Sequence, residues 1–247
     1  MNEHIVVVTG ADPLDDRIAA LVPDDALVLA ADGGLDVALA AGLTPGVLIG
    51  DLDSVSIDAL DWAAENGTIE RHPADKDHTD TELALRHAVE LRPRRLTLIG
   101  GGDRLDHTIA ALGALGAPHL TSIPEIDAWW GGEHVDVVHG PARRRLRLEP
   151  GSTLSLLVFG RHCEKVRLDG VRWPLRDAQL ATAVGVGVSN EITAPDGTVS
   201  VALSDGVLTI FDVPHPSSAS AASTSASTDS DARRSDASTP PTNGAAS

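Results

Sequence analysis

Four short acidic segments of this sequence each follow an apolar run. They are Asp32-Gly33-Gly34, Gly50-Asp51-Leu52-Asp53-Ser54, Asp75-Lys76-Asp77-His78-Thr79-Asp80 and Gly100-Gly101-Gly102-Asp103-Arg104-Leu105-Asp106-His107. A single acidic loop residue is usually a helix cap or a solvated turn, but four such loops in one chain favour a shared site. Proteins typically hold Mg²⁺ through one or two carboxylates together with substrate phosphates. The four segments therefore favour metal-assisted phosphate chemistry.

Two of these segments contain closely spaced carboxylates. Asp51 and Asp53 are two residues apart and can direct oxygens at one cation, unless Asp53 or Ser54 only caps the helix expected from about residue 56. Asp77 and Asp80 share a face at a helix start and can supply a metal ligand and a nucleotide contact. Thr79 and Glu82 also have the spacing of a capping box, which is compatible with such a site.

The glycine-rich segment can bring backbone N–H groups close to a polyphosphate, and Arg104 can neutralise charge that develops during phosphoryl transfer. The chain lacks a Walker A loop, GxGxxG, GxSxG and HExxH, which disfavours P-loop, dinucleotide-binding and common hydrolase functions. His78 and His107 lie beside the acidic segments and are candidate ligands of a metal-dependent hydrolase. A histidine beside a helix cap is more often a structural donor.

The elements expected to position these residues alternate between strand and helix. Apolar runs at 4–10, 26–34, 46–54, 67–73 and 94–102 are separated by helix-like segments, which predicts an α/β domain with a mostly parallel, Rossmann-like sheet. Ligands of such sheets bind beyond the carboxyl ends of the strands, where the acidic segments fall. After about residue 124, short alternating runs predict an all-β, sandwich-like module. We expect domains at 1–140 and 141–213, and a disordered Ser/Ala/Thr/Pro-rich tail at 214–247.

The composition excludes several kinds of protein. The 247 residues carry a net charge of −17, which disfavours nonspecific binding to nucleic acid or anionic membranes. No apolar run approaches the roughly 20 residues that span a bilayer, and the N-terminus does not resemble a secretory signal. The single cysteine, Cys163, excludes a disulfide framework. We therefore expect a soluble, cytoplasmic protein with neither a nucleic-acid nor a membrane partner.

Four motifs together resemble the thiamine pyrophosphokinase family: ADGG (31–34), GDLDS (50–54), KDHTD (76–80) and RLDH (104–107). The resemblance covers about residues 4–213. It implies transfer of a pyrophosphoryl group from ATP, as co-substrate, to thiamine, which gives thiamine diphosphate and AMP with Mg²⁺ as cofactor. Asp103 departs from the pattern, because a glycine is more usual there, and this departure bears on the nucleotide contacts.

The resemblance implies a role for each segment. Asp51, Asp53 and Asp80 are the expected metal ligands, and these three with Asp77 and Arg104 are the expected catalytic residues. Asp80 or Asp77 is expected to orient the thiamine hydroxyl or accept its proton. The expected nucleotide contacts are Asp32, Gly33, Gly34, Lys76, Thr79, Gly101, Gly102, Asp106 and His107.

Two further stretches, GVRWPL (170–175) and VSNE (188–191), are similar to the family's thiamine-binding segments. Ser189 and Asn190 can hydrogen-bond an aminopyrimidine, and Trp173 either stacks on a thiazolium or belongs to the core of the β module. The family further implies a homodimer whose active sites are shared between subunits. Trp173 or the Trp129–Trp130 pair are candidate anchors of that interface.

Two alternatives remain open from the sequence. A pyrophosphokinase that acts on a hydroxymethyl-pterin can use the same catalytic residues, although GVRWPL and VSNE favour thiamine. A nonenzymatic thiamine- or nucleotide-binding regulator is the other, and the intact aspartates in all four segments argue against it.

Overall fold

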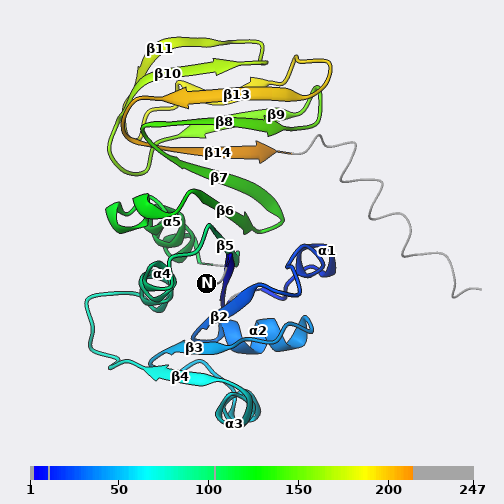
Figure 1. The fold of residues 1–247 in the computed structure, drawn as a ribbon, viewed down its shortest axis with the longest axis vertical. Coiled ribbons are helices and arrows are strands. Elements are labelled where there is room, and N and C mark those ends of the chain that lie inside the picture. Colours follow the sequence, from blue (N-terminus) through cyan, green and yellow to red (C-terminus); the bar gives the residue numbers. More distant parts are fainter. Residues whose placement is uncertain (1–2, 11, 103, 214–247) are drawn as a thin grey trace, which may run out of the picture. The chain divides into compact units, whose positions relative to one another are not determined.

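Strands and helices alternate through the first half of the chain, as the sequence predicts. A computed structural model describes residues 3–213 except 11 and 103. Figure 1 shows this half in blue to green. Its elements are β1 (His4–Thr9), α1 (Asp16–Ala19), β2 (Leu27–Ala31), α2 (Gly34–Ala40), β3 (Val47–Gly50), α3 (Ile57–Asn66), β4 (Thr68–Arg71), α4 (Asp80–Glu90), β5 (Arg95–Gly100), α5 (Leu105–Ala114) and the 3₁₀ helix η1 (Pro118–Ser122).

The second half is built of strands. They are β6 (Glu125–Trp130), β7 (Glu133–His139), β8 (Ala142–Arg147), β9 (Thr153–Leu157), β10 (Cys163–Asp169), β11 (Leu175–Leu180), β12 (Gly187–Glu191), β13 (Thr198–Leu203) and β14 (Val207–Val213). This part confirms the expected β module. The predicted disordered tail, 214–247, lies outside the described residues.

One ten-stranded sheet runs through both halves, in the order β12-β9-β14-β7-β6-β5-β1-β2-β3-β4. The pairs from β6 to β4 are parallel, and those from β6 to β12 are antiparallel. At the centre, Val7 lies opposite Leu29 on one side and Leu98 on the other. The expected parallel sheet is therefore continued by strands of the β region rather than ending at a separate module.

Alternate residues of β1 explain why its apolar run is unbroken. Ile5 and Val7 pack on one side with α4 and α5, whereas Val6 and Val8 pack on the other with α1 and α2. All four are fully buried. Burial of one such side chain contributes roughly 1.5–3 kcal/mol, so helices on both faces favour the continuous apolar run.

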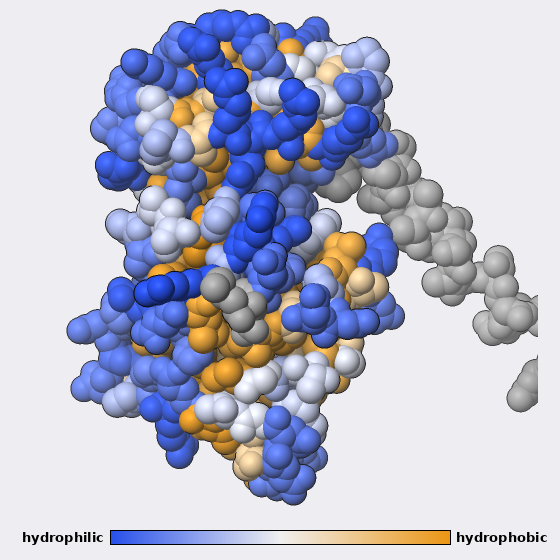
Figure 2. All heavy atoms as spheres, in the orientation of Figure 1, coloured by the Kyte–Doolittle hydropathy of each residue, from blue (hydrophilic) through white to orange (hydrophobic). Residues whose placement is uncertain are grey.

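A second, four-stranded sheet has the order β11-β10-β13-β8. Val166, Leu168 and Val201 from this sheet share one core with Leu154 and Ile210 of the ten-stranded sheet. Most positions of β10 alternate buried and exposed residues, and β13 alternates buried and half-buried ones, as is typical of a sheet with one solvated face. Figure 2 shows hydrophilic residues over most of the visible surface, and apolar residues gather mainly over its lower half. None of the described helices is long and apolar enough to cross a membrane.

Candidate active site

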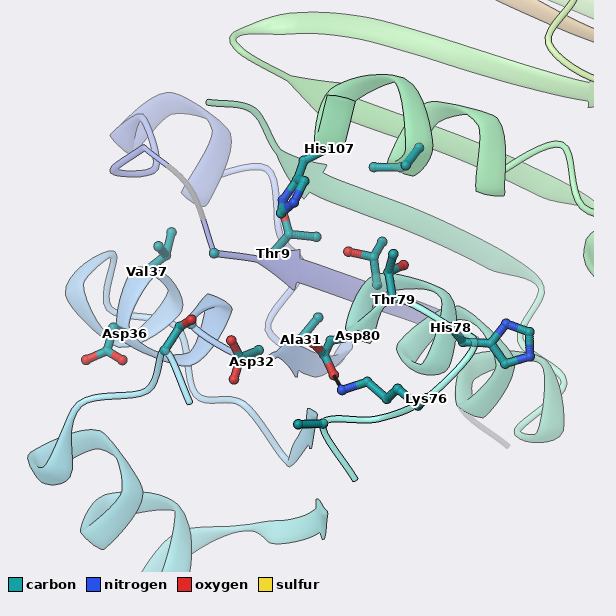
Figure 3. A pocket seen from close by; sticks show the side chains of 17 residues that line it. Thr9, Ala31, Asp32, Asp36, Val37, Lys76, His78, Thr79, Asp80 and His107 are labelled. Carbon is teal, nitrogen blue, oxygen red and sulfur yellow. Dashed lines mark ion pairs between the residues drawn. The ribbon is translucent and has the colours of Figure 1, made fainter. Parts of the chain in front are cut away.

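A cavity of about 550 Å³ opens at the carboxyl ends of the parallel strands (Figure 3). At the base of the cavity, the start of α2 packs directly on β1. This close packing requires Gly34, because a Cβ there would lie 2.1 Å from the carbonyl oxygen of Val8. Seven of the residues predicted to act at this edge or considered as metal ligands line the cavity: Asp32, Gly33, Lys76, His78, Thr79, Asp80 and His107. The loops therefore meet at one edge, as expected for a parallel sheet.

Three carboxylates from three different loops form the most acidic point of this edge. Asp32, Asp51 and Asp80 each offer an oxygen, and these oxygens all lie within 4.8 Å of one another. Within the described structure, Oδ1 of Asp32 and Oδ1 of Asp80 are buried and make no hydrogen bond. Buried acceptors without donors are costly, and such a set suits a hard cation.

Gly50 allows these loops to approach each other. Its φ is +154°, and a Cβ here would lie 3.0 Å from Asp80 Oδ1 and 3.1 Å from the Cβ of Asp32. A larger residue would push into the space between the two carboxylates. The glycine that begins GDLDS is thus required by the geometry of this site as well as by its backbone.

Asp53 is the predicted metal ligand that does not join this group. It is exposed, and its carboxylate accepts a hydrogen bond from the Ser54 hydroxyl at 2.8 Å. The reason lies in Leu52, which has a φ of +70° and turns inward to pack with α2 and α3. The structure instead brings Asp32, predicted as a nucleotide contact, to the two carboxylates.

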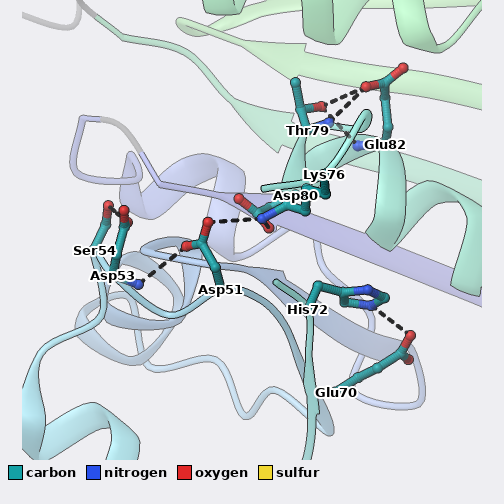
Figure 4. A network of polar contacts seen from close by, with 9 residues as sticks. All are labelled: Asp51, Asp53, Ser54, Glu70, His72, Lys76, Thr79, Asp80 and Glu82. Atoms are coloured by element: carbon teal, nitrogen blue, oxygen red, sulfur yellow. Dashed lines mark hydrogen bonds and ion pairs between the residues drawn. The ribbon is translucent and has the colours of Figure 1, made fainter. Parts of the chain in front are cut away.

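Lys76 lies between two of the three carboxylates (Figure 4). Its Nζ is 2.8 Å from Asp51 Oδ2, to which it donates a hydrogen bond, and 2.9 Å from Asp80 Oδ1, an ion pair without hydrogen-bond alignment. Although desolvation opposes it, these two carboxylates raise the pKa of Lys76 above its usual value. The ammonium is therefore held charged at the acidic edge.

The carboxylates respond differently to this setting. Burial, followed by the neighbouring charges of Asp80 and Asp53, raises the pKa of Asp32. The hydrogen bond from Lys76 instead lowers the pKa of Asp51. Asp32 thus carries a charge that the protein alone compensates poorly.

The start of α4 fixes Asp80. Thr79 is the N-cap: its Oγ1 accepts from the N–H of Glu82 at 3.2 Å, and Glu82 Oε2 accepts from the N–H of Thr79 at 2.8 Å. This confirms the predicted capping box. Asp77 is exposed and does not line the cavity, so the structure separates the two aspartates considered for the thiamine hydroxyl.

The glycine-rich loop and the start of α5 line a smaller cleft beside the cavity. Both spaces share Thr9 and His107, and Gly101, Gly102 and Arg104 line the small one. A Cβ on Gly101 would lie 2.4 Å from the N of Gly131, so close packing against the β6–β7 turn also demands this glycine.

Arg104 pairs with Asp106 in a bidentate contact of 2.6 and 3.2 Å. Both side chains are more than half exposed, and the guanidinium lowers the pKa of Asp106. The pair ties together two residues that the sequence predicts to act at the phosphates.

Asn190, predicted to contact thiamine, is buried and holds the main chain of Trp173. Its Oδ1 accepts from the N–H groups of Trp173 and Glu191, both at 3.0 Å, and its Nδ2 donates to the Trp173 carbonyl at 2.8 Å. Most of its hydrogen-bonding capacity is used within the protein. Asn190 therefore positions the tryptophan segment.

Trp173 itself is 56 % exposed, so the alternative that it belongs to the core of the β module is wrong. The Arg172 guanidinium lies 5.0 Å from the ring centroid and pairs with Glu191. Ser189 is also exposed, with a φ of +61°. None of Trp173, Ser189 and Asn190 lines the cavity that holds the aspartates.

The sequence interpretation missed several cavity residues. Thr9 ends β1, and Asp36 of α2 accepts a hydrogen bond from the N–H of Ser56 at 3.0 Å, which ties α2 to the start of α3. Trp130 lines the small cleft and donates to Thr108 Oγ1 at 3.2 Å. The position of Thr9 at the end of a buried strand was the available signal, whereas the role of Asp36 depends on a contact 20 residues away.

Family models match two parts of the chain. Residues 18–124 match "Thiamin pyrophosphokinase, catalytic domain", and residues 143–208 match "Thiamin pyrophosphokinase, vitamin B1 binding domain". Together the matches cover more than two thirds of the sequence, including all three clustered aspartates and the Trp173 and Ser189 segments.

Individual proteins agree with these matches. A thiamine pyrophosphokinase of Bacillus subtilis is 26 % identical over 207 residues, which covers 80 % of this chain and 92 % of the relative. Solved structures named as thiamin pyrophosphokinases from B. subtilis, Geobacillus thermodenitrificans and Candida albicans superpose with TM-scores of 0.72, 0.71 and 0.69 at 22 %, 24 % and 14 % identity. They cover 86 %, 87 % and 86 % of this chain and 99 %, 99 % and 90 % of their own, so the fold is shared over nearly their whole length.

Proposed function

Because the chain belongs to the thiamin pyrophosphokinase family, it is an enzyme that transfers a pyrophosphoryl group from ATP to thiamine, and we propose that this transfer takes place in the cavity at the carboxyl ends of the parallel strands. The observation that carries the proposal is the convergence of Asp32, Asp51 and Asp80 from three loops. A pocket with convergent charged groups at this edge is the expected place for nucleotide chemistry in an open α/β sheet.

We assign these three aspartates as the residues that hold Mg²⁺. The buried Oδ1 atoms of Asp32 and Asp80 make no hydrogen bond in the described structure, and Gly50 leaves the space between Asp32 and Asp80 open. When bound, the ion neutralises phosphate charge and orients the transferred group. Asp53 is left out of the ligand set because its carboxylate lies outside the cluster.

In the reaction, the hydroxyl oxygen of thiamine bonds to the β-phosphorus of ATP. The bond from that phosphorus to the oxygen shared with the α-phosphorus breaks, AMP leaves, and the hydroxyl proton passes to a carboxylate or to water. Of the two aspartates considered for orienting this hydroxyl, Asp80 lines the cavity and is the one retained. The amides of Gly101 and Gly102, with Arg104, are placed to stabilise the phosphates.

We further propose that thiamine binds between this cavity and the β region of a second subunit. Trp173 presents an exposed ring for the cationic thiazolium. Ser189 is also exposed and precedes Asn190, which holds the main chain of Trp173, yet neither Trp173 nor Ser189 lines the cavity of its own chain. A homodimer in which one subunit supplies the aspartates and the other supplies Trp173 would complete the site. We also propose that this reaction takes place in the cytoplasm, as expected from the sequence.

The activity is tested by quantifying AMP and thiamine diphosphate after mixing the protein with ATP, Mg²⁺ and thiamine. We expect both products in equal amounts, and neither when Mg²⁺ is removed by chelation. A hydroxymethyl-pterin offered instead of thiamine should give no AMP. Binding of thiamine and ATP without AMP formation would contradict the enzymatic function.

The shared site is tested by complementation. Asp51→Asn and Ser189→Ala/Trp173→Ala subunits, each inactive alone, should recover activity when mixed, because one cleft of the heterodimer carries neither defect. A monomer by light scattering that turns over thiamine at the full rate would contradict the dimeric site.

A further inference from the structure

Lys76 occupies the centre of the acidic edge in a way that the reaction itself does not explain. Its ammonium contacts Asp51 at 2.8 Å and Asp80 at 2.9 Å, and the three side chains are only 14 %, 16 % and 23 % exposed. Figure 3 shows its side chain extending to Asp80, and Figure 4 shows its ammonium beside both Asp51 and Asp80. Lys76 enters from the loop between β4 and α4, three residues before the N-cap Thr79.

The same two carboxylates belong to the set assigned to Mg²⁺. Mg²⁺ binds carboxylate oxygens at about 2.0–2.1 Å and requires near-octahedral geometry. An ion held by Asp51 Oδ2 and Asp80 Oδ1 would take the place that the Lys76 ammonium now holds. A divalent ion and the Lys76 ammonium bound to the same two carboxylate oxygens would repel each other strongly.

We propose that Lys76 is an internal counter-cation that holds Asp51 and Asp80 together in the absence of metal and must leave them before a divalent ion can bind. The inference rests on the proposed metal site. It makes Lys76 a positioning residue that controls metal entry.

The nucleotide supplies the alternative partner for the displaced ammonium. A lysine is a compact charge on a flexible four-carbon stem, so it can move without moving its backbone. Lys76 lines the same cavity as Thr9 and His107, which also border the cleft of the glycine-rich loop. Phosphates bound along this cavity come within reach of the ammonium. The free protein is then expected to bind metal weakly, and the nucleotide to favour exchange of the ammonium for the ion.

The sequence offers an unusually direct test, because Lys76 and Lys165 are its only lysines. Protein labelled with [ε-¹³C]lysine gives two lysine signals, assigned with Lys165→Met. We expect Mg²⁺ with α,β-methylene-ATP to shift the Lys76 signal strongly and to leave that of Lys165, an exposed residue of β10, in place. A Lys76 signal that does not move at saturating Mg²⁺ and nucleotide would overturn the proposal.

Metal affinity provides a second readout that does not depend on turnover. Lys76→Met keeps the apolar stem and removes the charge, so Mn²⁺ measured by electron paramagnetic resonance without nucleotide should bind at least about tenfold tighter than to the wild type. Lys165→Met is the matched control and should bind Mn²⁺ like the wild type. Equal or weaker Mn²⁺ binding by a folded Lys76→Met protein would contradict the counter-cation role, and Lys76→Gln repeats the measurement if the methionine variant does not fold.

Failure of this inference is distinguishable from failure of the proposed function. Wild-type protein that forms AMP with Mg²⁺, together with unchanged Mn²⁺ affinity in Lys76→Met, rejects the counter-cation alone. Wild-type protein that binds no Mn²⁺ even with α,β-methylene-ATP rejects the assigned metal site and the inference with it.

Discussion

Two acidic clusters of this protein differ in how completely their charges are compensated. Asp127 on β6 is almost fully buried, yet it accepts hydrogen bonds from Arg95 at 2.6 and 3.3 Å, from Thr97 at 2.7 Å and from His134 at 3.1 Å. Although burial opposes it, these donors lower the pKa of Asp127 to about 2. In the cluster of Asp32, Asp51 and Asp80, by contrast, the buried Oδ1 of Asp32 makes no hydrogen bond in the described structure, and Oδ1 of Asp80 makes an ion pair with Lys76 but no hydrogen bond.

The difference separates a structural role from a functional one. Asp127 lies opposite Thr97 of β5 and Asp136 of β7, where the parallel part of the sheet meets the antiparallel part. Its donors come from both parts, so the cluster stabilises their junction. The Asp32 oxygen that makes no hydrogen bond weakens the fold slightly and leaves a place for a ligand.

The largest expected effect comes from breaking the satisfied cluster. Asp127→Asn leaves Arg95 and His134 without their carboxylate, which should lower the free energy of unfolding by about 3 kcal/mol, the low end for buried pairs because the Arg95 side chain is 45 % exposed. Turnover per folded molecule should not change. Urea unfolding measures the loss, and Asp177→Asn, which breaks the exposed pair with Arg167, should leave stability unchanged. A fall in turnover with unchanged stability would contradict the comparison.

Neutralising an aspartate of the Asp32, Asp51 and Asp80 cluster should instead reduce turnover and leave stability nearly unchanged. Asp51→Asn removes a ligand oxygen and the partner of Lys76, so turnover with ATP and thiamine should fall about 10²–10³-fold while the melting temperature stays near that of the wild type. Asp77→Asn, in the exposed part of a neighbouring loop, serves as the control and should remain active. Equal activity losses in both variants would show that the cluster of Asp32, Asp51 and Asp80 does not define the aspartates needed for turnover.

The contribution of Asp127 to the free energy of unfolding should depend on pH. The folded-state pKa of Asp127, about 2, is below its ordinary value of 3.8, so its contribution is complete above pH 4 and is lost as the pH falls from about 4 to 2. The shift corresponds to roughly 2 kcal/mol. Urea unfolding at pH 5 and pH 2.5 should show this difference in the wild type, and Asp127→Asn should abolish most of it. The same slope in both proteins would assign the effect to other groups.

The smallest effect is expected at Asp32. Its raised pKa means that the ionised form is less favourable in the folded state than in the unfolded state, so its charge lowers stability at neutral pH. Asp32→Asn should raise the melting temperature without metal by about 1–2 °C. Added Mg²⁺ with α,β-methylene-ATP should stabilise the wild type more than this variant, as differential scanning calorimetry can measure. A lower melting temperature without metal would mean that Asp32 is already compensated.

Local chemistry made part of this structure predictable. The capping box of Thr79 and Glu82 depends on residues three positions apart, and it forms as the sequence indicates. The continuous apolar run of β1 indicated a strand covered on both faces, and Ile5 and Val6 indeed pack on opposite sides of the sheet. The acidic loops share one edge because parallel strands place all their carboxyl ends on the same side.

Other features depend on contacts between distant segments. The exchange of Asp53 for Asp32 follows from the inward turn of Leu52 and the missing Cβ of Gly50, neither of which the spacing of the carboxylates reveals. The sequence predicts that the Asn190 amide contacts a ligand. In the structure the amide hydrogen-bonds to the main chain of Trp173, 17 residues earlier in the chain. The single sheet that joins both halves likewise depends on the pairing of β6 with both β5 and β7.

Strand periodicity, capping and the polarity of parallel strands are local properties. The sequence alone therefore indicates which residue types face each side of a strand and which lie at the carboxyl edge of the sheet. Which carboxylate oxygens lie close together, and which side chains already have hydrogen-bond partners, depends on tertiary contacts. Those outcomes depend on how loops far apart in the chain approach one another. In this protein they place Lys76 between Asp51 and Asp80, a contact that joins residues 25 positions apart.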